Sequence, residues 1–254
     1  PTNDRAWLVA HDSDVLTTEE HQSFESLVLR RLRGEPVAYL VGCKEFFGLN
    51  LAVTRDVLVP RPDTECLVEW ALDCIPLTLA HLSEGGAAKT CAVLDLGTGS
   101  GAIGLAIKAN HASADVLLVD ASRAALDVAL GNAALLGLAV RGLQSDWFEN
   151  VPSDQRFDVI VSNPPYIADG DAHMAALGHE PVMALTSGAD GLDAIRRIAQ
   201  DAPQYLKANG WLLLEHGYDQ ADAVRDLLTA HGFAQVTSRL DLNGIERCSG
   251  GTLK

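Results

Sequence analysis

The chain has 254 residues, of which 48% are hydrophobic and 21% charged, as is typical of one large folded domain with a small extension. Its 34 acidic and 19 basic residues give a net charge of −15, which disfavours binding to nucleic-acid phosphates. The sequence shows no apolar run near the roughly 18–20 residues of a membrane span, no basic start of a secretory signal and no cysteine spacing typical of a metal site. We therefore expect a cytoplasmic protein that binds no membrane, nucleic acid or metal.

Two groups of arginines are the local exceptions to the acidic balance. They are Arg30, Arg31 and Arg33 in one segment and Arg196 and Arg197 in another. Both groups stand at helical spacing beside acidic residues, a pattern that favours a solvated helix face over a nucleic-acid site.

Residues 1–36 predict a helical domain. Val28 and Leu32 recur at helical spacing, and Gly34 followed by Pro36 ends the helix. Residues 37–60 predict a linker with a β-hairpin, because they contain the β-like runs VAYLVG, KEFFGLNLAV and DVLVP with a turn at Gly-Leu-Asn.

Residues 61–254 predict the main domain. It opens with the amphipathic helix of PRPDTECLVEWALDCI, and the glycine pair at 85–86 is a natural break. From residue 91 onward apolar strands alternate with helices, as in a parallel sheet covered by helices. The last two strands are joined by Asn243-Gly244, a hairpin signal. A parallel α/β sheet that ends in an antiparallel hairpin indicates a seven-stranded, Rossmann-like class I methyltransferase fold better than a dinucleotide-binding fold.

A glycine loop follows the first of these strands, in VLDLGTGSGAIGLAI. Gly97, Gly99 and Gly101 allow a tight turn and a close approach to a ligand, and the helix start behind them offers free N–H groups. Because Gly99, Gly101 and Gly104 also satisfy G-x-G-x-x-G, the loop alone leaves a dinucleotide reading open.

Two aspartates accompany the loop. Asp120 ends the next strand, where its carboxylate would accept the hydroxyl groups of a ribose, although it is also placed to cap the following helix. Both NAD and S-adenosylmethionine carry that ribose. Asp95, just before the glycines, either holds the loop or meets the amino-acid end of the cofactor.

The segment Asn163-Pro164-Pro165-Tyr166 ends another buried strand, FDVIVS. A planar amide or amino nitrogen is a poor nucleophile, and acceptors on its two N–H groups return electron density to it. The Asn163 oxygen and the Pro164 carbonyl supply such acceptors, the prolines hold them in place, and Tyr166 offers a flat face. A proline-stiffened turn is the structural alternative, but the glycine loop upstream favours methyl transfer.

Two further interpretations remain open at this point. An amino-group methyltransferase for DNA adenine or RNA guanine would use a similar tetrapeptide, but would need a flipped base and a basic surface. A nicotinamide-binding or cofactor-sensing module would leave Asn163–Tyr166 unexplained.

The combination of these motifs resembles the HemK/PrmC family, the peptide chain release factor glutamine methyltransferases. The resemblance rests on Gly97-Thr98-Gly99-Ser100-Gly101, on Asp120 and on Asn163-Pro164-Pro165-Tyr166. The stretch from residue 34 to 72, with Arg61-Pro62-Asp63-Thr64-Glu65, is similar to that family's link between its helical and catalytic domains.

The resemblance implies N5-methylation of the glutamine in the Gly-Gly-Gln motif of peptide chain release factors, with S-adenosyl-L-methionine as cofactor and S-adenosyl-L-homocysteine as product. It implies that residues 97–101 hold the methionine end of the cofactor, Asp120 its ribose and Trp147 or its neighbours the adenine. Asn163, Pro164, Pro165 and Tyr166 would bind the glutamine, with Asn163 also touching the cofactor. The helical domain of the family is longer than residues 1–36, and we expect a monomer.

Five side chains near the expected site keep two interpretations each. Trp147, between Asp146 and Phe148, either stacks on adenine or packs in the core. Arg61 and Glu65 either close over the site or join the two domains. For Glu215-His216, packing or a loop hydrogen bond is favoured over an acid/base pair.

Overall fold

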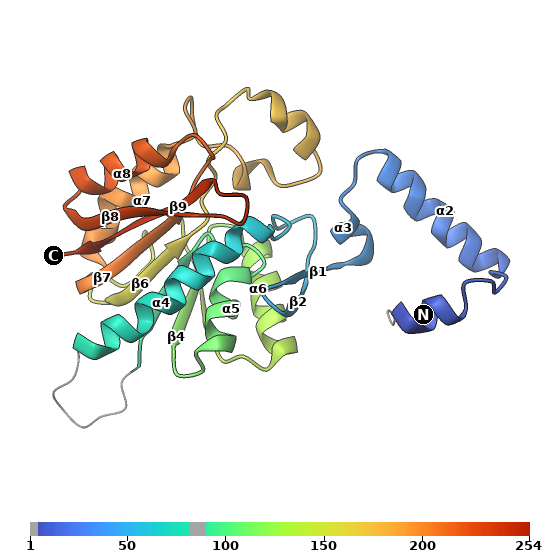
Figure 1. Cartoon of the computed structure of the whole chain (residues 1–254), viewed down its shortest axis with the longest axis horizontal. Helices are drawn as coiled ribbons and strands as arrows, with labels where there is room; N and C mark the ends of the chain where they lie inside the picture. Colours follow the sequence, from blue (N-terminus) through green and yellow to red (C-terminus); the bar gives the residue numbers. More distant parts are fainter. Residues whose placement is uncertain (1–4, 82–89) are drawn as a thin grey trace.

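The computed structural model describes residues 5–81 and 90–254, so the expected break at the glycine pair 85–86 lies outside the described residues. Within those ranges the main domain holds a seven-stranded sheet in the order β5-β4-β3-β6-β7-β9-β8 (Figure 1). The strands are β3 (Ala92–Leu96), β4 (Asp115–Asp120), β5 (Arg141–Gln144), β6 (Phe157–Ser162), β7 (Leu206–Glu215), β8 (Phe233–Leu240) and β9 (Glu246–Leu253).

The strand directions match the predicted class I methyltransferase fold. Strands β3 to β7 run parallel, whereas β9 is antiparallel to both β7 and β8. The β8–β9 connection turns at Gly244, which has a φ of +77° that glycine adopts without strain. The carboxyl ends of β3, β4, β5 and β6 therefore lie along one edge of the sheet.

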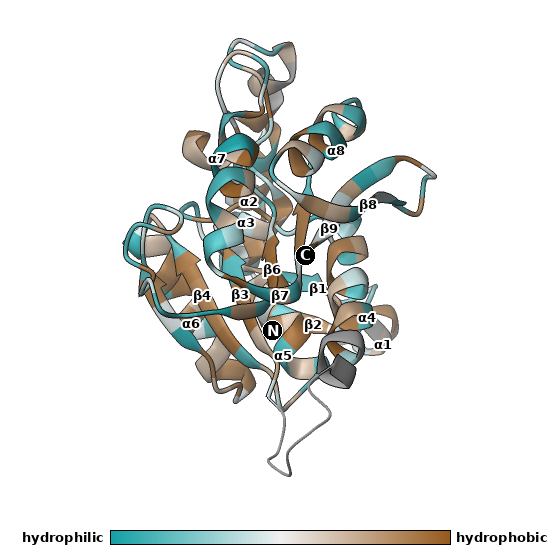
Figure 2. Ribbon diagram, turned by 90° about the vertical axis from the view of Figure 1, so that its left-hand side faces the viewer, coloured by the Kyte–Doolittle hydropathy of each residue, from teal (hydrophilic) through white to brown (hydrophobic). Residues whose placement is uncertain are grey.

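Helices cover both faces of this sheet, as the apolar runs predict. Helices α4 (Glu65–His81), α5 (Ala102–Asn110) and α6 (Arg123–Leu136) pack on one face. Helices α7 (Asp193–Asp201) and α8 (Ala221–Ala230) pack on the other. Figure 2 shows the hydrophobic strands between these two layers. Successive side chains of a strand enter opposite cores, so that Val93 contacts the first layer and Leu94 the second.

The N-terminal part contains three helices and a hairpin: α1 (Arg5–Ala10), α2 (Thr18–Leu32), α3 (Val37–Val41), β1 (Cys43–Phe46) and β2 (Leu49–Ala52). Helix α2 begins with a capping box, in which Thr17 and Glu20 satisfy each other's backbone N–H groups. It ends just before Gly34, as predicted, and none of its residues is buried. Figure 1 shows α1 and α2 to one side of the sheet domain.

Two predicted β runs are wrong. Residues 37–41 form helix α3, because Pro36 supplies the extended residue before it and Gly42 the left-handed residue after it. A short apolar run between such signals cannot be assigned by periodicity alone. The run DVLVP forms no strand; Val57 and Val59 instead pack in a small apolar cluster against Ala125 of α6.

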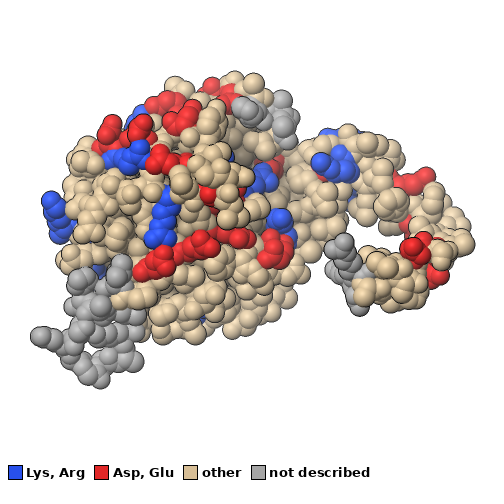
Figure 3. All heavy atoms as spheres, in the orientation of Figure 1, with Lys and Arg blue, Asp and Glu red and all other residues tan. Residues whose placement is uncertain are grey.

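Three of the five arginines singled out in the sequence form ion pairs with acidic side chains. Arg30 binds Glu35, Arg196 binds Asp190 and Asp193, and Arg197 binds Asp146 and Glu149. On the face drawn in Figure 3, Asp and Glu side chains accompany many of the Lys and Arg side chains of the described residues. Within 5–81 and 90–254 we find no helix with the length and apolar character of a membrane span.

Candidate active site

A cavity of about 270 Å³ opens at the carboxyl edge of the sheet. Four segments that follow successive strands line it, together with the linker and a loop after β6. The lining residues include Arg61 and Thr64; Gly97, Thr98, Gly99 and Ser100; Asp120; Trp147; Asn163 and Pro165; and Pro181 and Met183. Of the predicted site residues, Gly101, Pro164 and Tyr166 do not line this cavity.

The glycine loop between β3 and α5 forms one wall. Gly97 and Gly99 have φ values of +69° and +54°, which residues with a Cβ rarely adopt, and nothing would meet a Cβ on Gly99 within 4 Å. Gly101 lies behind the loop, where its N–H donates to the Thr98 carbonyl at 2.8 Å. A Cβ on Gly104 would stand 2.4 Å from Leu118, so only glycine lets α5 lie this close to β4. The loop therefore presents backbone to the cavity.

Asp95 holds the shape of this loop through hydrogen bonds. Its Oδ2 accepts hydrogen bonds from the Thr98 hydroxyl at 2.6 Å and from the Gly104 N–H at 2.9 Å. The side chain is fully buried, and burial raises its pKa to about 6. The sequence left two roles for Asp95: to hold the glycine loop or to contact the cofactor. The contacts favour the first role, because Asp95 does not line the cavity.

Asp120 lies at the end of β4 beside the loop. Its Oδ2 accepts from the Gly99 N–H at 2.9 Å and its Oδ1 from the Ser122 N–H at 2.8 Å. An ionised carboxylate has about four acceptor positions, so both oxygens can still accept from ligand hydroxyls. Burial raises the pKa of Asp120, while these two backbone donors oppose that effect.

Trp147 supplies the aromatic wall. Its backbone has a φ of +50°, which is uncommon for a bulky residue and often marks a functional site. Its ring lies against Gly97, where an added Cβ would stand 3.5 Å from the Trp147 Cζ3 atom. Its neighbour Phe148 is buried and stacks on Tyr205 with a 4.6 Å centroid distance. Thus Trp147 lines the cavity and also packs against the core in which Phe148 is buried.

Asn163 and Pro165 bring the second motif into the same cavity. The Asn163 Nδ2 donates to the Thr64 hydroxyl oxygen at 3.2 Å. Pro164 is buried, and the Tyr166 hydroxyl points to the Glu215 carboxylate, at 3.4 Å. The glycine loop, the Asp120 carboxylate, the Trp147 indole and the Asn163 amide therefore line one cavity.

Comparison with known proteins places these motifs in a family. Residues 3–42 match the model of the PrmC N-terminal domain, and residues 76–188 match that of the methyltransferase small domain. A curated release factor glutamine methyltransferase of Bordetella pertussis is 52% identical over 98% of this chain and 89% of its own length. This chain belongs to the release factor glutamine methyltransferase family.

Solved structures of other methyltransferases share the fold of this chain. A methyltransferase from Pyrococcus furiosus aligns with a TM-score of 0.58 at 18% identity, over 88% of this chain and 98% of that one. The T. thermophilus 16S rRNA N2 G1207 methyltransferase, solved with AdoMet and guanosine, aligns with a TM-score of 0.56 at 20% identity, over 84% of this chain and 50% of that one. At these identities the likeness concerns the fold alone.

The chain is therefore a methyltransferase, and the cofactor expected from its sequence is S-adenosylmethionine. The cavity residues fit that molecule. The open backbone at Gly99 suits its polar amino-acid end, the Asp120 oxygens suit ribose hydroxyls and the Trp147 ring suits a flat base.

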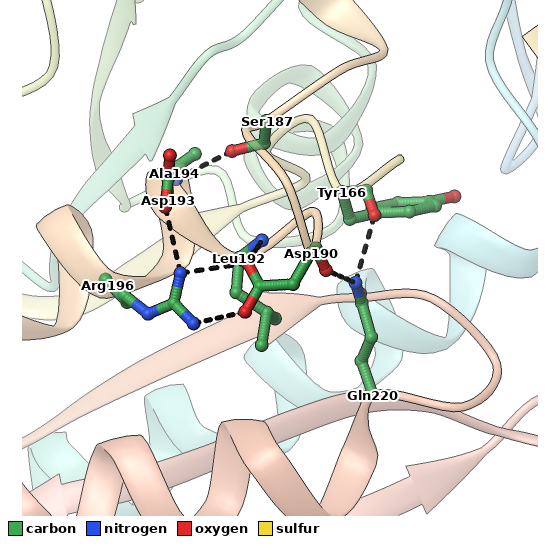
Figure 4. Close-up of polar contacts among 8 residues, drawn as sticks. All are labelled: Tyr166, Ser187, Asp190, Leu192, Asp193, Ala194, Arg196 and Gln220. Carbon is green, nitrogen blue, oxygen red and sulfur yellow. Dashed lines mark hydrogen bonds and ion pairs between the residues drawn. The ribbon is translucent and has the colours of Figure 1, made fainter. Parts of the chain in front are cut away.

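The backbone of Tyr166, three residues after Asn163, is held by Gln220, as Figure 4 shows. Gln220 donates from Nε2 to the Tyr166 carbonyl at 3.0 Å and to the Asp190 carbonyl at 3.2 Å, while its Oε1 accepts from the Gly217 N–H at 2.8 Å. Gly191 has a φ of +76°, and a Cβ there would stand 2.2 Å from the Tyr166 carbonyl oxygen. The conformation of the family's Asn-Pro-Pro-Tyr motif thus depends on two distant loops.

The linker is tied to the loop that follows this motif. Arg61, which lines the cavity, forms an ion pair with the buried Glu180, and Glu180 also accepts from the Val59 N–H at 3.1 Å. Glu65 instead accepts from the Phe47 N–H at 3.1 Å and joins the β-hairpin to α4. Arg61 therefore stands at the site, whereas Glu65 connects two structural elements.

His216 has a packing role. It is fully buried and hydrogen-bonds the Ser249 hydroxyl at 2.8 Å and the Gly217 carbonyl at 2.9 Å. Burial lowers its pKa, so the ring stays neutral. The preference for packing over an acid/base pair at His216 agrees with these contacts.

Sequence reasoning missed three side chains that shape the site: Thr64, Glu180 and Gln220. Thr64 stands out in the sequence only as part of the stretch Arg61–Glu65, and no local pattern marks Gln220. The pair Glu180-Pro181 in an irregular segment is a weak signal for the loop that reaches the cavity.

Proposed function

We propose that this enzyme transfers the methyl group of S-adenosylmethionine to the N5 nitrogen of the glutamine in the Gly-Gly-Gln motif of peptide chain release factors. The observation that carries the proposal is that Asn163 lines the same cavity as the glycine loop and Asp120. The name and near full-length similarity of the relative from Bordetella pertussis support the choice of substrate.

The proposed chemistry needs orientation more than a strong base. The cofactor supplies a methyl group on a positively charged sulfur. Asn163 Oδ1 and the Pro164 carbonyl accept the two N–H groups of the glutamine amide, which increases electron density on its nitrogen and aims the lone pair. Tyr166 provides a flat surface near the amide. As the N–C bond forms, the bond between the methyl group and sulfur would break and leave a neutral thioether, and the nitrogen then releases one proton to water.

The remaining site residues serve the cofactor in this proposal. The loop 97–101, with Gly97, Thr98, Gly99, Ser100 and Gly101, surrounds the methionine end. Asp120 accepts from the ribose, Trp147 stacks on the adenine, and Asn163 touches both cofactor and substrate.

We also propose a three-part organisation, with a helical domain at 1–36, a linker at 37–60 and the catalytic domain at 61–254. The packing of Val57 and Val59 against α6 supports a linker that reaches the catalytic domain. We propose that the protein acts as a cytoplasmic monomer without nucleic-acid binding, which its net charge of −15 supports.

A methyl-transfer assay tests the substrate. The enzyme is incubated with methyl-labelled cofactor and a purified release factor, and the control is the same factor with its Gly-Gly-Gln glutamine replaced by glutamate, which has no amide nitrogen. We expect label in the first factor only. Label in both factors, or only in DNA or RNA supplied in parallel, would contradict the proposal.

A further inference from the structure

Thr64 is a buried polar residue beside Asn163. It comes from the turn before α4 and is only 4% exposed. The Asn163 Nδ2 donates to the Thr64 Oγ1 at 3.2 Å. Thr64 therefore contacts the proposed substrate-binding amide from a segment 99 positions away in the chain.

The contact between Thr64 and Asn163 has a direction. A threonine hydroxyl oxygen carries two acceptor lone pairs. The Thr64 Oγ1 accepts from the Asn163 Nδ2 at 3.2 Å, so the nitrogen end of the Asn163 amide faces Thr64.

This constraint decides which end of the Asn163 amide is available. The two ends of an asparagine amide have nearly the same shape but opposite hydrogen-bonding character. With Nδ2 held by Thr64, Oδ1 is left for the cavity. If the amide were turned over, Nδ2 would face the substrate, and it would bind the substrate amide's oxygen rather than its nitrogen.

We propose that Thr64 is a positioning residue that keeps the Asn163 oxygen directed at the substrate nitrogen. This inference rests on the proposed acceptor role of Asn163. It assigns to Thr64 the choice between the nitrogen and the oxygen of the incoming amide.

A pair of matched variants tests Thr64. Thr64→Val keeps the shape of the side chain but removes the hydroxyl, whereas Thr64→Ser keeps the hydroxyl. We expect Thr64→Val to lower kcat about tenfold, as for the loss of one hydrogen bond, with little change in KM or in the calorimetric Kd of S-adenosylmethionine. Thr64→Ser should restore most of kcat. Equal losses in Val and Ser variants, or a Kd that rises by the factor by which kcat/KM falls, would overturn the proposal.

A double-mutant cycle separates this inference from the proposed function. If Thr64 acts through Asn163, Thr64→Val should change the residual turnover of Asn163→Ala less than about twofold. An equal tenfold loss in both backgrounds would overturn the positioning role and leave the proposed function intact. Normal turnover of Asn163→Ala alone would instead overturn the proposed function. Thr64→Ala provides the same cycle if the valine variant does not fold.

Discussion

At the scale of single residues, the site depends on acceptors placed before any ligand arrives. Asn163 is held by Thr64, and Asp120 by two backbone N–H groups. Such preorganised groups cost little rearrangement when substrate binds, which is why single substitutions here should separate cofactor binding from methyl transfer.

Replacement of Asn163 by alanine should affect methyl transfer far more than cofactor binding, because Asn163 is one of several residues proposed to touch the cofactor. Loss of one preorganised acceptor is expected to lower kcat by about 10²–10³-fold, or about 3–4 kcal/mol of barrier. Steady-state kinetics and calorimetry with S-adenosylmethionine measure the two effects separately. A weakened Kd with unchanged kcat would contradict the assignment of Asn163.

Replacement of Asp120 by asparagine should have the opposite profile. Asparagine has a single oxygen acceptor and no charge, so the ribose hydroxyls lose charge-assisted bonds. We expect cofactor binding to weaken by about 1.5–3 kcal/mol. Calorimetric titration checks this value, and an unchanged Kd would remove Asp120 from the ribose site.

Asp95 should make stability depend on pH. Burial raises its pKa from 3.8 to about 6, so the folded state holds its proton more tightly than the unfolded state. The free energy of unfolding should therefore fall as pH rises from about 4 to about 6, by on the order of 2–3 kcal/mol in total. Denaturant titrations of the wild type and Asp95→Asn across this range measure the contribution, which the variant should lack. Parallel curves for the two proteins would contradict the prediction.

At the scale of secondary-structure elements, the loop after β6 is shaped by its neighbours. Gly191 packs against this loop so closely that a Cβ on it would stand 2.2 Å from the Tyr166 carbonyl oxygen. This packing fixes the path of the chain just after Asn163 and Pro165, so a change at Gly191 should reach the site without touching it.

Gly191→Ala has a matched control in Gly170→Ala. Both glycines have positive φ, +76° and +81°, but a Cβ on Gly191 would meet the Tyr166 carbonyl at 2.2 Å, whereas a Cβ on Gly170 meets nothing within 4 Å. Gly170→Ala should cost only the backbone strain, about 1–2 kcal/mol of stability. Gly191→Ala should cost more and should lower kcat at least about tenfold. Equal stability and kcat in the two variants would show that the contact does not shape the site.

Local patterns predicted most of the elements, and their failures have physical causes. Apolar runs such as CAVLDL and FDVIVS predict buried strands because a strand covered on both faces needs continuous hydrophobicity. The run VAYLV is equally apolar but forms α3, because Pro36 and Gly42 at its ends, rather than its composition, determine its conformation. Similarly, Val57 and Val59 are buried without belonging to any strand.

At the scale of the whole molecule, the sheet explains which site residues were predictable. Gly97, Asp120 and Asn163 each follow a parallel strand, and the carboxyl ends of such strands meet at one edge. Contacts that join separate parts of the chain carry no local signal. Glu180 reaches Arg61 over 119 positions and Asn163 reaches Thr64 over 99, so neither pair could be inferred from the sequence.

The most direct test of the central claim is tandem mass spectrometry of a release factor after incubation with this enzyme and isotopically methyl-labelled S-adenosylmethionine. The proposal predicts a single labelled methyl group on the side-chain nitrogen of the Gly-Gly-Gln glutamine, formed by the wild-type enzyme and about 10²–10³-fold more slowly by Asn163→Ala. A methyl group on any other atom of the release factor, or equal rates for the two enzymes, would contradict the claim that Asn163 presents a glutamine amide to the cofactor.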